Sequence, residues 1–348
     1  MTKSAETEHG KGRPDARPRT ARPGGKPLAS ISLDLDNLWA YLKIHGDAGW
    51  ESYPTYLEPL SAIVTERLAR HELTITIFIV GQDAALEKNR GAMQALASQG
   101  HEIGNHSLSH EPWFHTYSYA EVVKEIGESE EHIERATGKR PHGFRGPGFS
   151  LSPDTLQVLA ERGYLYDAST FPTFLGPLAR AYYFWSTKGL SEAEREKRKQ
   201  LFGTAAEGLR PITPYVWNLA GGPERTNPLV EIPVTTMPLV RLPIHMSYLI
   251  YLAVVSRPLA KAYLKSALAM CRLTRVEPSF LLHPLDFMGG DRVSELAFFP
   301  GMKASTEFKL DLFDEVIEVM RGSFELVTME QHARHILAQG GLQARTLQ

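Results

Sequence analysis

Two aspartates stand at a spacing that suits a metal-dependent site. Asp34 and Asp36 flank Leu35 directly after an apolar run. Side chains two residues apart on a strand point to the same face, so both carboxylates could face one site. Taken alone, this pair also fits an ordinary acidic turn.

His106 and His110 form the second feature, with three residues between them. On a helical turn this spacing places both imidazoles on one face. Two imidazoles and a carboxylate are a common set of zinc ligands that leaves positions open for water. The spacing alone arises by accident in many chains. Its place after a predicted strand, which Asp36 shares, favours a metal site.

Two further segments carry groups that amide hydrolysis needs. Arg145 could hold a carboxylate, and the backbone of the following Gly146-Pro147-Gly148 could turn an amide toward an oxyanion. His283 ends a late apolar run and is a natural general acid. The alternatives are a plain turn before a helix in the first segment and a structural histidine in the second.

Several other reactive residue types lack such surroundings. His132 lies in a charged stretch, and His332 and His335 lie near the C-terminal end, so we expect all three at the surface. Cys271 is the only cysteine and follows an apolar stretch. It forms no internal disulfide, and we interpret it as a small buried residue rather than a nucleophile.

Strands and helices that alternate along the chain must position these groups. Apolar runs predict strands at residues 29–35, 73–80, 102–105, 143–145, 165–167, 231–235, 279–283 and 324–327. Helical spacing and end signals predict helices at residues 56–71, 83–100 (capped by Asp83), 119–137 (ended by Gly138), 152–162 and 305–320. Such alternation is typical of a parallel sheet or barrel, whose active site lies at the carboxyl ends of the strands.

The chain divides by composition into three parts. Residues 1–27 are rich in Arg, Pro and Gly and predict a disordered basic tail, residues 28–335 predict one α/β barrel domain, and residues 336–348 a C-terminal tail. Residues 170–230 break the strand–helix rhythm, and we interpret them as a long excursion with a charged helix at 191–200. Residues 237–256 are strongly apolar but contain Arg241 and His245. They predict a helix packed under the barrel, or alternatively one at a membrane interface.

The charge balance and the ends of the chain restrict the partners. Lys plus Arg total 38 and Asp plus Glu total 40, for a formal net charge of −2, so no global field favours nucleic acid. The N-terminal stretch has no apolar centre of the kind a signal peptide requires. We therefore expect a cytoplasmic protein, with peripheral contact at the inner membrane face as an option.

In chain order the features are Asp-x-Asp, His-x-x-x-His, Arg-x-Pro and Leu-x-His. This order closely resembles the polysaccharide-deacetylase family, also called the NodB-homology or carbohydrate esterase 4 family, over about residues 31–287 and more weakly to 331. The resemblance implies a distorted (β/α) barrel of about seven parallel strands. It also implies a metal-dependent hydrolase that removes an N-acyl group, by default acetyl, from an amino sugar of a cell-surface glycan or its lipid-linked precursor.

The resemblance also implies roles for the metal site and the catalytic base. Asp34 matches the family's catalytic base, and Arg145 matches the arginine that orients it. Asp36, His106 and His110 match the metal ligands. Zinc is the default ion for a carboxylate and two imidazoles, with cobalt, nickel and manganese open.

The remaining implied roles concern the substrate side. Gly148 matches the position whose amide helps to hold the oxyanion, and Leu281 would line the pocket for the acyl methyl group. His283 would be the general acid. Asp167 resembles the aspartate of a fourth motif that orients this histidine, but Asp286 stands three residues after His283 and could orient it instead.

Two departures from the family pattern bear on the substrate. Many members of the family have two adjacent aspartates, whereas here Leu35 separates Asp34 from Asp36. The separated pair resembles the branch of the family with allantoinase-like and some peptidoglycan-deacetylase members. The tryptophan usual after the fourth-motif aspartate is missing near Asp167. A deformylase or allantoinase-like amidohydrolase acting on a small molecule is therefore an alternative. An inactive carbohydrate-binding protein is another, against which the complete set of site residues argues.

Overall fold

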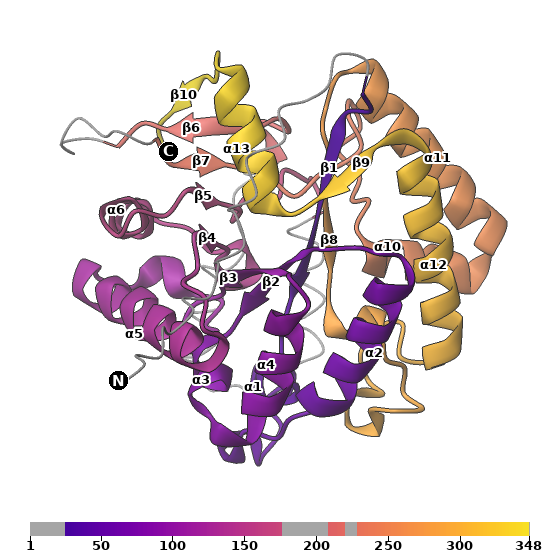
Figure 1. Ribbon diagram of the computed structural model, residues 1–348. Coiled ribbons are helices and arrows are strands. Elements are labelled where there is room, and N and C mark those ends of the chain that lie inside the picture. Colours follow the sequence, from indigo (N-terminus) through magenta and orange to yellow (C-terminus); the bar gives the residue numbers. More distant parts are fainter. Residues whose placement is uncertain (1–24, 176–207, 220–227, 348) are drawn as a thin grey trace, which may run out of the picture.

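One curled, mostly parallel β-sheet forms the centre of the molecule, and helices pack on its outside (Figure 1). The computed structural model describes residues 25–175, 208–219 and 228–347. The strand order is β10-β6-β7-β5-β4-β3-β2-β1-β8, with β9 beside β1. The bounds are β1 (Leu28–Asp34), β2 (Thr76–Ile79), β3 (Glu102–Asn105), β4 (Gly143–Phe144), β5 (Tyr166–Asp167), β6 (Tyr215–Trp217), β7 (Val230–Glu231), β8 (Ser279–Leu282), β9 (Glu325–Val327) and β10 (Ala344–Arg345).

The curled sheet confirms the predicted distorted barrel. Among the described strands, only β6 and β7 pair in antiparallel fashion. The chain beyond β7 then approaches β8, because Thr235 N donates to Ser279 O at 3.1 Å and Ser279 N donates to Thr235 Oγ1 at 2.6 Å. These bonds bring the two sides of the curled sheet together.

Alternation along β1 separates an apolar outer face from a polar interior. Ile31 and Leu33 belong to the main hydrophobic core beneath the outer helices. Ser32 and Asp34 are equally buried but point to the other face of the strand. The interior of the barrel therefore carries polar side chains, which can serve a site at its mouth.

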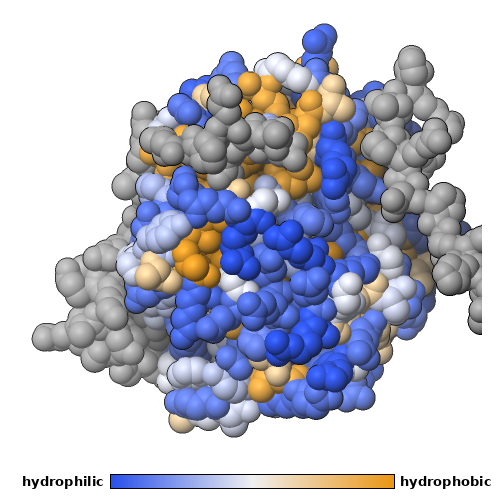
Figure 2. Space-filling model, turned by 60° about the vertical axis from the view of Figure 1, so that its left-hand side comes forward, coloured by the Kyte–Doolittle hydropathy of each residue, from blue (hydrophilic) through white to orange (hydrophobic). Residues whose placement is uncertain are grey.

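The helices cover the outer face of the sheet. Their bounds are α1 (Leu38–His45), α2 (Leu57–Arg70), α3 (Gly81–Ala85), α4 (Arg90–Ser98), α5 (Tyr119–Thr137), α6 (Pro153–Glu161), α10 (Met246–Val255), α11 (Arg257–Leu273), α12 (Thr306–Ser323) and α13 (Met329–Gln339). The predicted span of α5 is confirmed: Ser118 and Glu121 form a capping box, and Gly138 ends the helix with a φ of 71°. The face of the molecule that carries α5 is largely hydrophilic (Figure 2).

The helix predicted at residues 83–100 is wrong in its first half. Two helices, α3 and α4, share this stretch, and Asp83 lies inside α3 rather than at a cap. Its carboxylate is fully buried and accepts hydrogen bonds from Asn37 Nδ2 at 2.7 Å and Trp39 Nε1 at 2.9 Å. Burial raises the pKa of Asp83 to about 7. The side chain ties α3 to the loop that follows β1.

The domain boundaries differ from the prediction at the C-terminal end. Residues 336–348 were expected to form a tail, but α13 continues to Gln339 and β10 pairs with β6. Ile336 is buried in a core cluster. The basic tail up to residue 24 and the charged helix expected at 191–200 lie outside the described residues. Of the expected excursion, β6 and the start of β7 join the sheet.

The apolar stretch at 237–256 leads into α10. Met246, Leu249 and Ile250 are buried, in line with the packed helix that we expected. Val255, at the other end of the helix, is 80% exposed. Among the residues described, no helix combines the length and the apolar character needed to cross a membrane.

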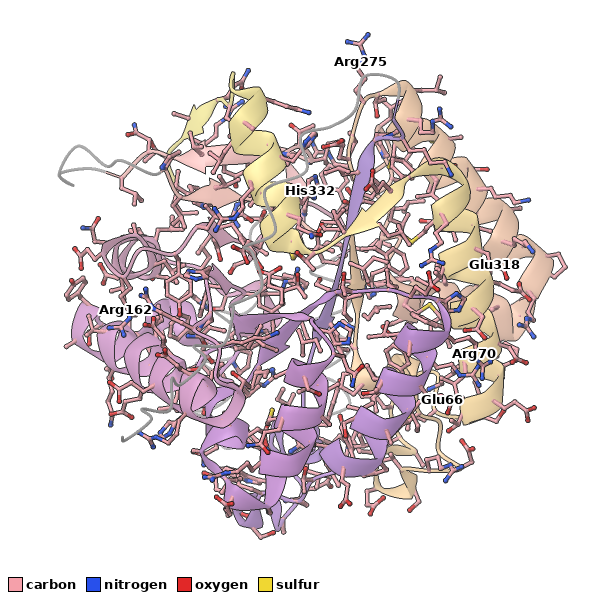
Figure 3. The ribbon with its side chains drawn as sticks, in the orientation of Figure 1. Glu66, Arg70, Arg162, Arg275, Glu318 and His332 are labelled. Atoms are coloured by element: carbon pink, nitrogen blue, oxygen red, sulfur yellow. The ribbon has the colours of Figure 1, made fainter. Side chains whose placement is uncertain are left out.

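The expectation that His332 lies at the surface is wrong. The side chain of His332, labelled in Figure 3, extends from α13 toward the barrel and is fully buried. Its Nδ1 lies 3.0 Å from Ser30 Oγ, and its Nε2 lies 3.4 Å from Glu277 Oε2. A polar interior surface explains why an imidazole can be accommodated at this end of the barrel.

Candidate active site

The register of the parallel strands brings four of the predicted site residues to one end of the barrel. Leu33 on β1 pairs with Leu282 on β8, so Asp34 and His283 are neighbours at the strand ends. Likewise β3 pairs with β4 through their last residues, which places His106 beside Arg145. Because the carboxyl ends of parallel strands share one edge, residues far apart in sequence meet at this mouth.

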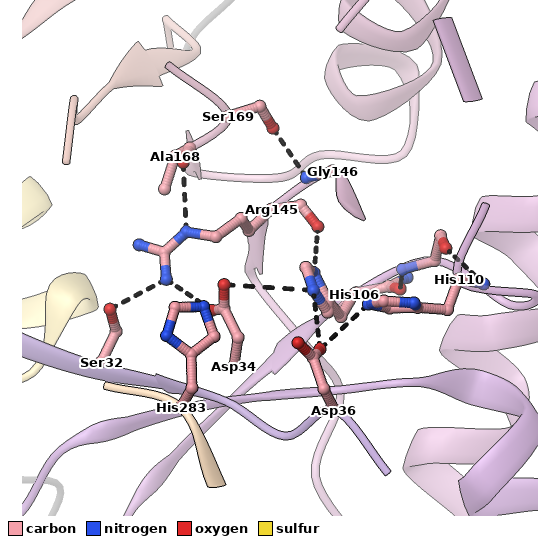
Figure 4. Close-up of polar contacts among 12 residues, drawn as sticks. Ser32, Asp34, Asp36, His106, His110, Arg145, Gly146, Ala168, Ser169 and His283 are labelled. Carbon is pink, nitrogen blue, oxygen red and sulfur yellow. Dashed lines mark hydrogen bonds and ion pairs between the residues drawn. The ribbon is translucent and has the colours of Figure 1, made fainter. Parts of the chain in front are cut away.

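Asp36, His106 and His110 converge, as the metal-site hypothesis requires. Asp36 Oδ1 lies 2.9 Å from His110 Nε2 and 3.4 Å from His106 Nε2. One ligand atom from each of the three residues lies within 4.8 Å of the other two. Figure 4 shows the Asp36 carboxylate facing both rings.

The two histidines do not lie on a helical turn, contrary to the prediction. Residues 106–110 form a loop in which Ser107 and His110 adopt positive φ angles of 64° and 51°. Asn105 Oδ1 accepts from Ser107 N, and Glu125 on α5 accepts from the amides of Leu108 and Ser109. These bonds hold the loop in the strained conformation that turns both imidazoles toward Asp36.

The protonation pattern of His106 suits a cation. Its Nδ1 lies 2.6 Å from the carbonyl oxygen of Arg145, which can only accept, so Nδ1 carries the hydrogen. In a neutral ring the Nε2 lone pair then faces Asp36 Oδ1, which itself has no hydrogen-bond partner. A lone pair and a carboxylate repel unless a cation lies between them. The three residues therefore fit a divalent ion, and the bond to the carbonyl is the usual support of a metal-binding histidine.

The pKa directions at this cluster reflect the same arrangement. Burial acts to raise the pKa of Asp36, but the two imidazoles outweigh it and hold that pKa well below its usual value. Burial acts to lower the pKa of His106, but Asp34 and Asp36 outweigh it and raise that pKa. A region of concentrated negative charge meets the imidazoles here, which favours a positive ion.

Asp34 lies beside this cluster and is held by Arg145. Arg145 Nη1 donates to Asp34 Oδ1 at 2.5 Å and to Ser32 Oγ at 2.9 Å. Its guanidinium lies 4.4 Å from the centre of the Phe78 ring, and it is fully buried. A Cβ at Gly104 would lie 2.5 Å from the Phe78 ring, so glycine makes room for this stack. The other oxygen of Asp34 lies 4.0 Å from His106 Nε2.

The loop of residues 146–150 is here called the oxyanion loop. Among the described residues, one of its backbone N–H groups has no hydrogen-bond acceptor. Gly146 N donates to Ser169 Oγ, while the amides of Phe149 and Ser150 donate to carbonyls of the loop itself. Pro147 has no N–H. Gly148, with a φ of 59°, is therefore the loop position whose N–H has no hydrogen bond among the described residues, and it is exposed.

Of the two aspartates that the sequence offered as partners of His283, Asp286 is the one that lies beside it, together with Ser247. Asp286 Oδ2 accepts from His283 N at 2.7 Å, and Asp286 Oδ1 accepts from Ser247 Oγ at 2.8 Å. His283 Nδ1 lies 3.5 Å from Ser247 Oγ and 4.0 Å from Asp286 Oδ2. Its side chain is 24% exposed, so a substrate can reach it. Ser247 was missed because a serine in an apolar run carries no catalytic signal.

Asp167 lies elsewhere, so its expected contact with His283 is not seen among the described side chains. Asp167 pairs across the sheet with Glu231 and accepts from Ser169 Oγ at 2.5 Å. Burial raises the pKa of both carboxyl groups, and their proximity raises that of Glu231 further. Asp167 therefore belongs to a buried carboxyl pair, and Ser169, whose Oγ also accepts from Gly146 N, links it to the oxyanion loop.

Leu281 lies on the inner face of the sheet. It is 1% exposed and pairs with Ser32, on the same face of the sheet as Asp34. Its neighbours Phe280 and Leu282 belong instead to the outer core. His245, which the sequence showed only as an interruption of an apolar run, lies next to His283, with ring centroids 5.8 Å apart.

Comparisons with known proteins point to the family whose motifs these residues resemble. The family profile described as polysaccharide deacetylase matches residues 47–166, which include His106, His110 and Arg145. A peptidoglycan deacetylase of Helicobacter pylori is 34% identical over 201 residues, covering 55% of this chain and 66% of the relative. A peptidoglycan-N-acetylglucosamine deacetylase of Bacillus cereus is 28% identical over 102 residues, covering 29% of this chain and 36% of the relative.

The comparisons with solved structures agree on the fold. A crystal structure described as a candidate polysaccharide deacetylase of Mycobacterium smegmatis has a TM-score of 0.60 at 20% identity, covering 96% of this chain and 97% of that one. The sequence matches span about a third of the Bacillus protein and just under two thirds of the Helicobacter protein. The family profile and the Helicobacter relative thus show that this chain is similar in sequence to polysaccharide deacetylases, and the solved structure shows that it shares their fold.

Proposed function

We propose that the protein is a metal-dependent hydrolase that removes the N-acetyl group from an amino sugar of a glycan. One observation carries the proposal: Asp36, His106 and His110 converge beside a second carboxylate, Asp34, which Arg145 holds away from them. A ligand set and a separate base are what water-dependent amide cleavage requires. The two deacetylases matched by sequence, named for peptidoglycan, support the choice of substrate class.

Zinc is the ion we propose for the site. Two imidazoles and one carboxylate leave positions open for water and substrate, as in catalytic zinc sites. When bound, the ion would polarise the amide carbonyl and lower the pKa of a water molecule. Cobalt, nickel and manganese accept similar ligands, so the identity of the metal is part of the test.

Asp34 is the proposed general base. Arg145 holds one of the two carboxylate oxygens of Asp34: its Nη1 donates to Asp34 Oδ1 and also to Ser32 Oγ. The remaining oxygen of Asp34 faces the metal ligands at 4.0 Å from His106 Nε2. The group that could hold an ion consists of Asp36, His106 and His110 without Asp34. Asp34 would therefore be free to receive a proton from the water that attacks the amide there.

The opposite side of the site would complete the reaction. As water adds to the amide carbon, the Gly148 N–H would donate to the developing oxyanion. His283, held by Asp286 and Ser247, would then give a proton to the nitrogen of the amino sugar as the carbon–nitrogen bond breaks. Acetate and a free amine are the products, and Asp34 returns its proton to solvent. Leu281 would line the space for the acetyl methyl group.

The experiment that tests the proposal measures acetate and formate release from a panel of N-acylated amino sugars, with and without a chelator. The panel contains soluble N-acetylglucosamine oligosaccharides, peptidoglycan fragments, lipid-linked amino-sugar precursors, formamido sugars and allantoin. We expect acetate from at least one sugar, lost with chelator and restored by zinc. Formate or allantoin hydrolysis alone would favour the small-molecule alternative, and chelator-resistant release would refute the metal mechanism.

A further inference from the structure

An aromatic wall lines the general-acid side of the site. The ring of His245, which directly precedes α10, lies 5.6 Å from Phe171, 4.6 Å from Tyr248 and 5.8 Å from His283, measured between centroids. Phe149 in the oxyanion loop lies 5.1 Å from Phe171. Phe149, Phe171, His245 and Tyr248, here called the aromatic wall, therefore run without interruption from the oxyanion loop to the general acid.

The described residues pack against the His245 imidazole but do not use it in a hydrogen bond. His245 occupies the N-cap position of α10, but its side chain makes no capping hydrogen bond. Its Nδ1 is buried without a partner, and among the described residues no hydrogen bond reaches the ring. The side chain is only 7% exposed. A buried polar group without a partner is uncommon in a folded protein and calls for a functional explanation.

The charge state of His245 defines what it could bind. Burial lowers its pKa well below the usual value, and the nearby His283 and Arg145 lower it further. The ring is therefore neutral, with one N–H donor and one acceptor nitrogen. A hydroxyl group, which can either donate or accept, can bond either nitrogen of the neutral ring, whereas a carboxylate or phosphate would call for a cation.

We propose that His245 is a substrate-positioning residue whose imidazole hydrogen-bonds a ring hydroxyl of the amino sugar, while the aromatic wall packs against the C–H face of the sugar. The inference rests on the proposed function and specifies how the sugar is held. A pyranose ring placed against the wall lies beside His283, and this contact orients its amide nitrogen toward the proton donor. His245 itself takes no part in the proton transfers.

The experiment combines enzyme variants with a panel of substrates that each lack one hydroxyl. His245→Phe keeps an aromatic ring of the wall but removes both nitrogens, and His245→Gln keeps a donor and an acceptor. His132→Phe on α5 is the matched control for loss of an imidazole far from the wall. Parent and monodeoxy N-acetylglucosamine oligosaccharides are assayed for kcat and KM, and melting temperatures and zinc content are recorded for every variant.

We expect His245→Phe to lower kcat/KM on the parent substrate by about 10- to 100-fold, the usual effect of losing a buried hydrogen bond. One monodeoxy substrate should show the same loss with the wild-type enzyme but no additional loss with His245→Phe. His245→Gln should recover most of the activity, and His132→Phe should behave like the wild type. If His245→Phe fails to fold, His245→Leu serves as the second variant without nitrogens.

The possible failures are distinguishable. A loss that is the same for the parent and every monodeoxy substrate would overturn the inference, because a purely structural role has no reason to depend on one hydroxyl. Unchanged kinetics in a folded His245→Phe would overturn it as well. A wild-type enzyme that releases no acyl group from any sugar would overturn the proposed function, and this inference with it.

Discussion

Replacing each aspartate of the Asp-x-Asp pair with asparagine separates the base from the metal ligand. Asp36 Oδ1 lies 2.9 Å and 3.4 Å from the two imidazole nitrogens, whereas Asp34 approaches His106 Nε2 only to 4.0 Å. We therefore expect Asp36→Asn to weaken zinc binding by at least about 100-fold. Asp34→Asn should retain zinc and lose turnover.

The magnitudes for Asp34→Asn follow from its surroundings. A divalent ion and a unit charge about 4 Å apart interact by about 2 kcal/mol even in a water-like medium, so loss of the Asp34 charge should weaken zinc binding by about 30-fold or more, but by less than loss of the Asp36 ligand does. Loss of a general base lowers the rate by about 10²- to 10⁴-fold. Because asparagine can still accept from Arg145, the stability loss should fall at or below the low end of the about 3–5 kcal/mol seen when one partner of a buried ion pair is removed.

Three measurements on the same preparations test this prediction. Calorimetry gives zinc affinity, urea titration gives the free energy of unfolding, and acetate release gives kcat. An Asp34→Asn enzyme with more than a tenth of wild-type kcat would refute the role of Asp34 as base. An Asp34→Asn enzyme that loses zinc as completely as Asp36→Asn would show that the two aspartates are not divided as the geometry indicates.

Three further predictions concern stability. Burial, with Lys139 nearby, lowers the pKa of His101 from 6.5 to about 4, so the unfolded chain binds more protons in this range. The free energy of unfolding at pH values above 6.5 should fall by about 2 kcal/mol as the pH drops to 4, and by less in His101→Gln. Equal losses for the wild type and His101→Gln in urea titrations would contradict this. A Cβ at Gly81 would lie 2.6 Å from Ser129 Cα, so Gly81→Ala should lower the free energy of unfolding by about 2–3 kcal/mol. Gly91→Ala is the control, because a Cβ there has nothing within 4 Å and should not destabilise the fold. Similar melting temperatures of the two variants would refute the packing argument. Zinc at 100 times its Kd should stabilise the fold by about 2.7 kcal/mol, and a wild-type melting temperature that ignores zinc would count against the metal site.

Local patterns were sufficient to predict the framework of the site. Strand alternation has a period of two and depends on neighbouring residues, so the faces of β1 and the ends of β3 and β8 could be identified from the chain alone. The carboxyl ends of parallel strands share one edge, which is why Asp34, His106 and His283 were expected together and are found together. Gly138 was equally readable as the end of α5, because a glycine cap acts over three or four positions.

Contacts that depend on loop conformation and on distant segments could only be decided by the tertiary structure. His106 and His110 meet through a loop with positive φ angles, held by α5, rather than through a helical turn. The support of His283 by Asp286, and the placement of Asp167 against Glu231 instead, depend on how β5, β7 and β8 pack. His245 reaches the same site as His283 across 37 intervening positions along the chain, and its sequence context reveals only an interrupted apolar run. Side chains at such separations meet because burial and strand register fix the backbone, and no local pattern encodes that distance.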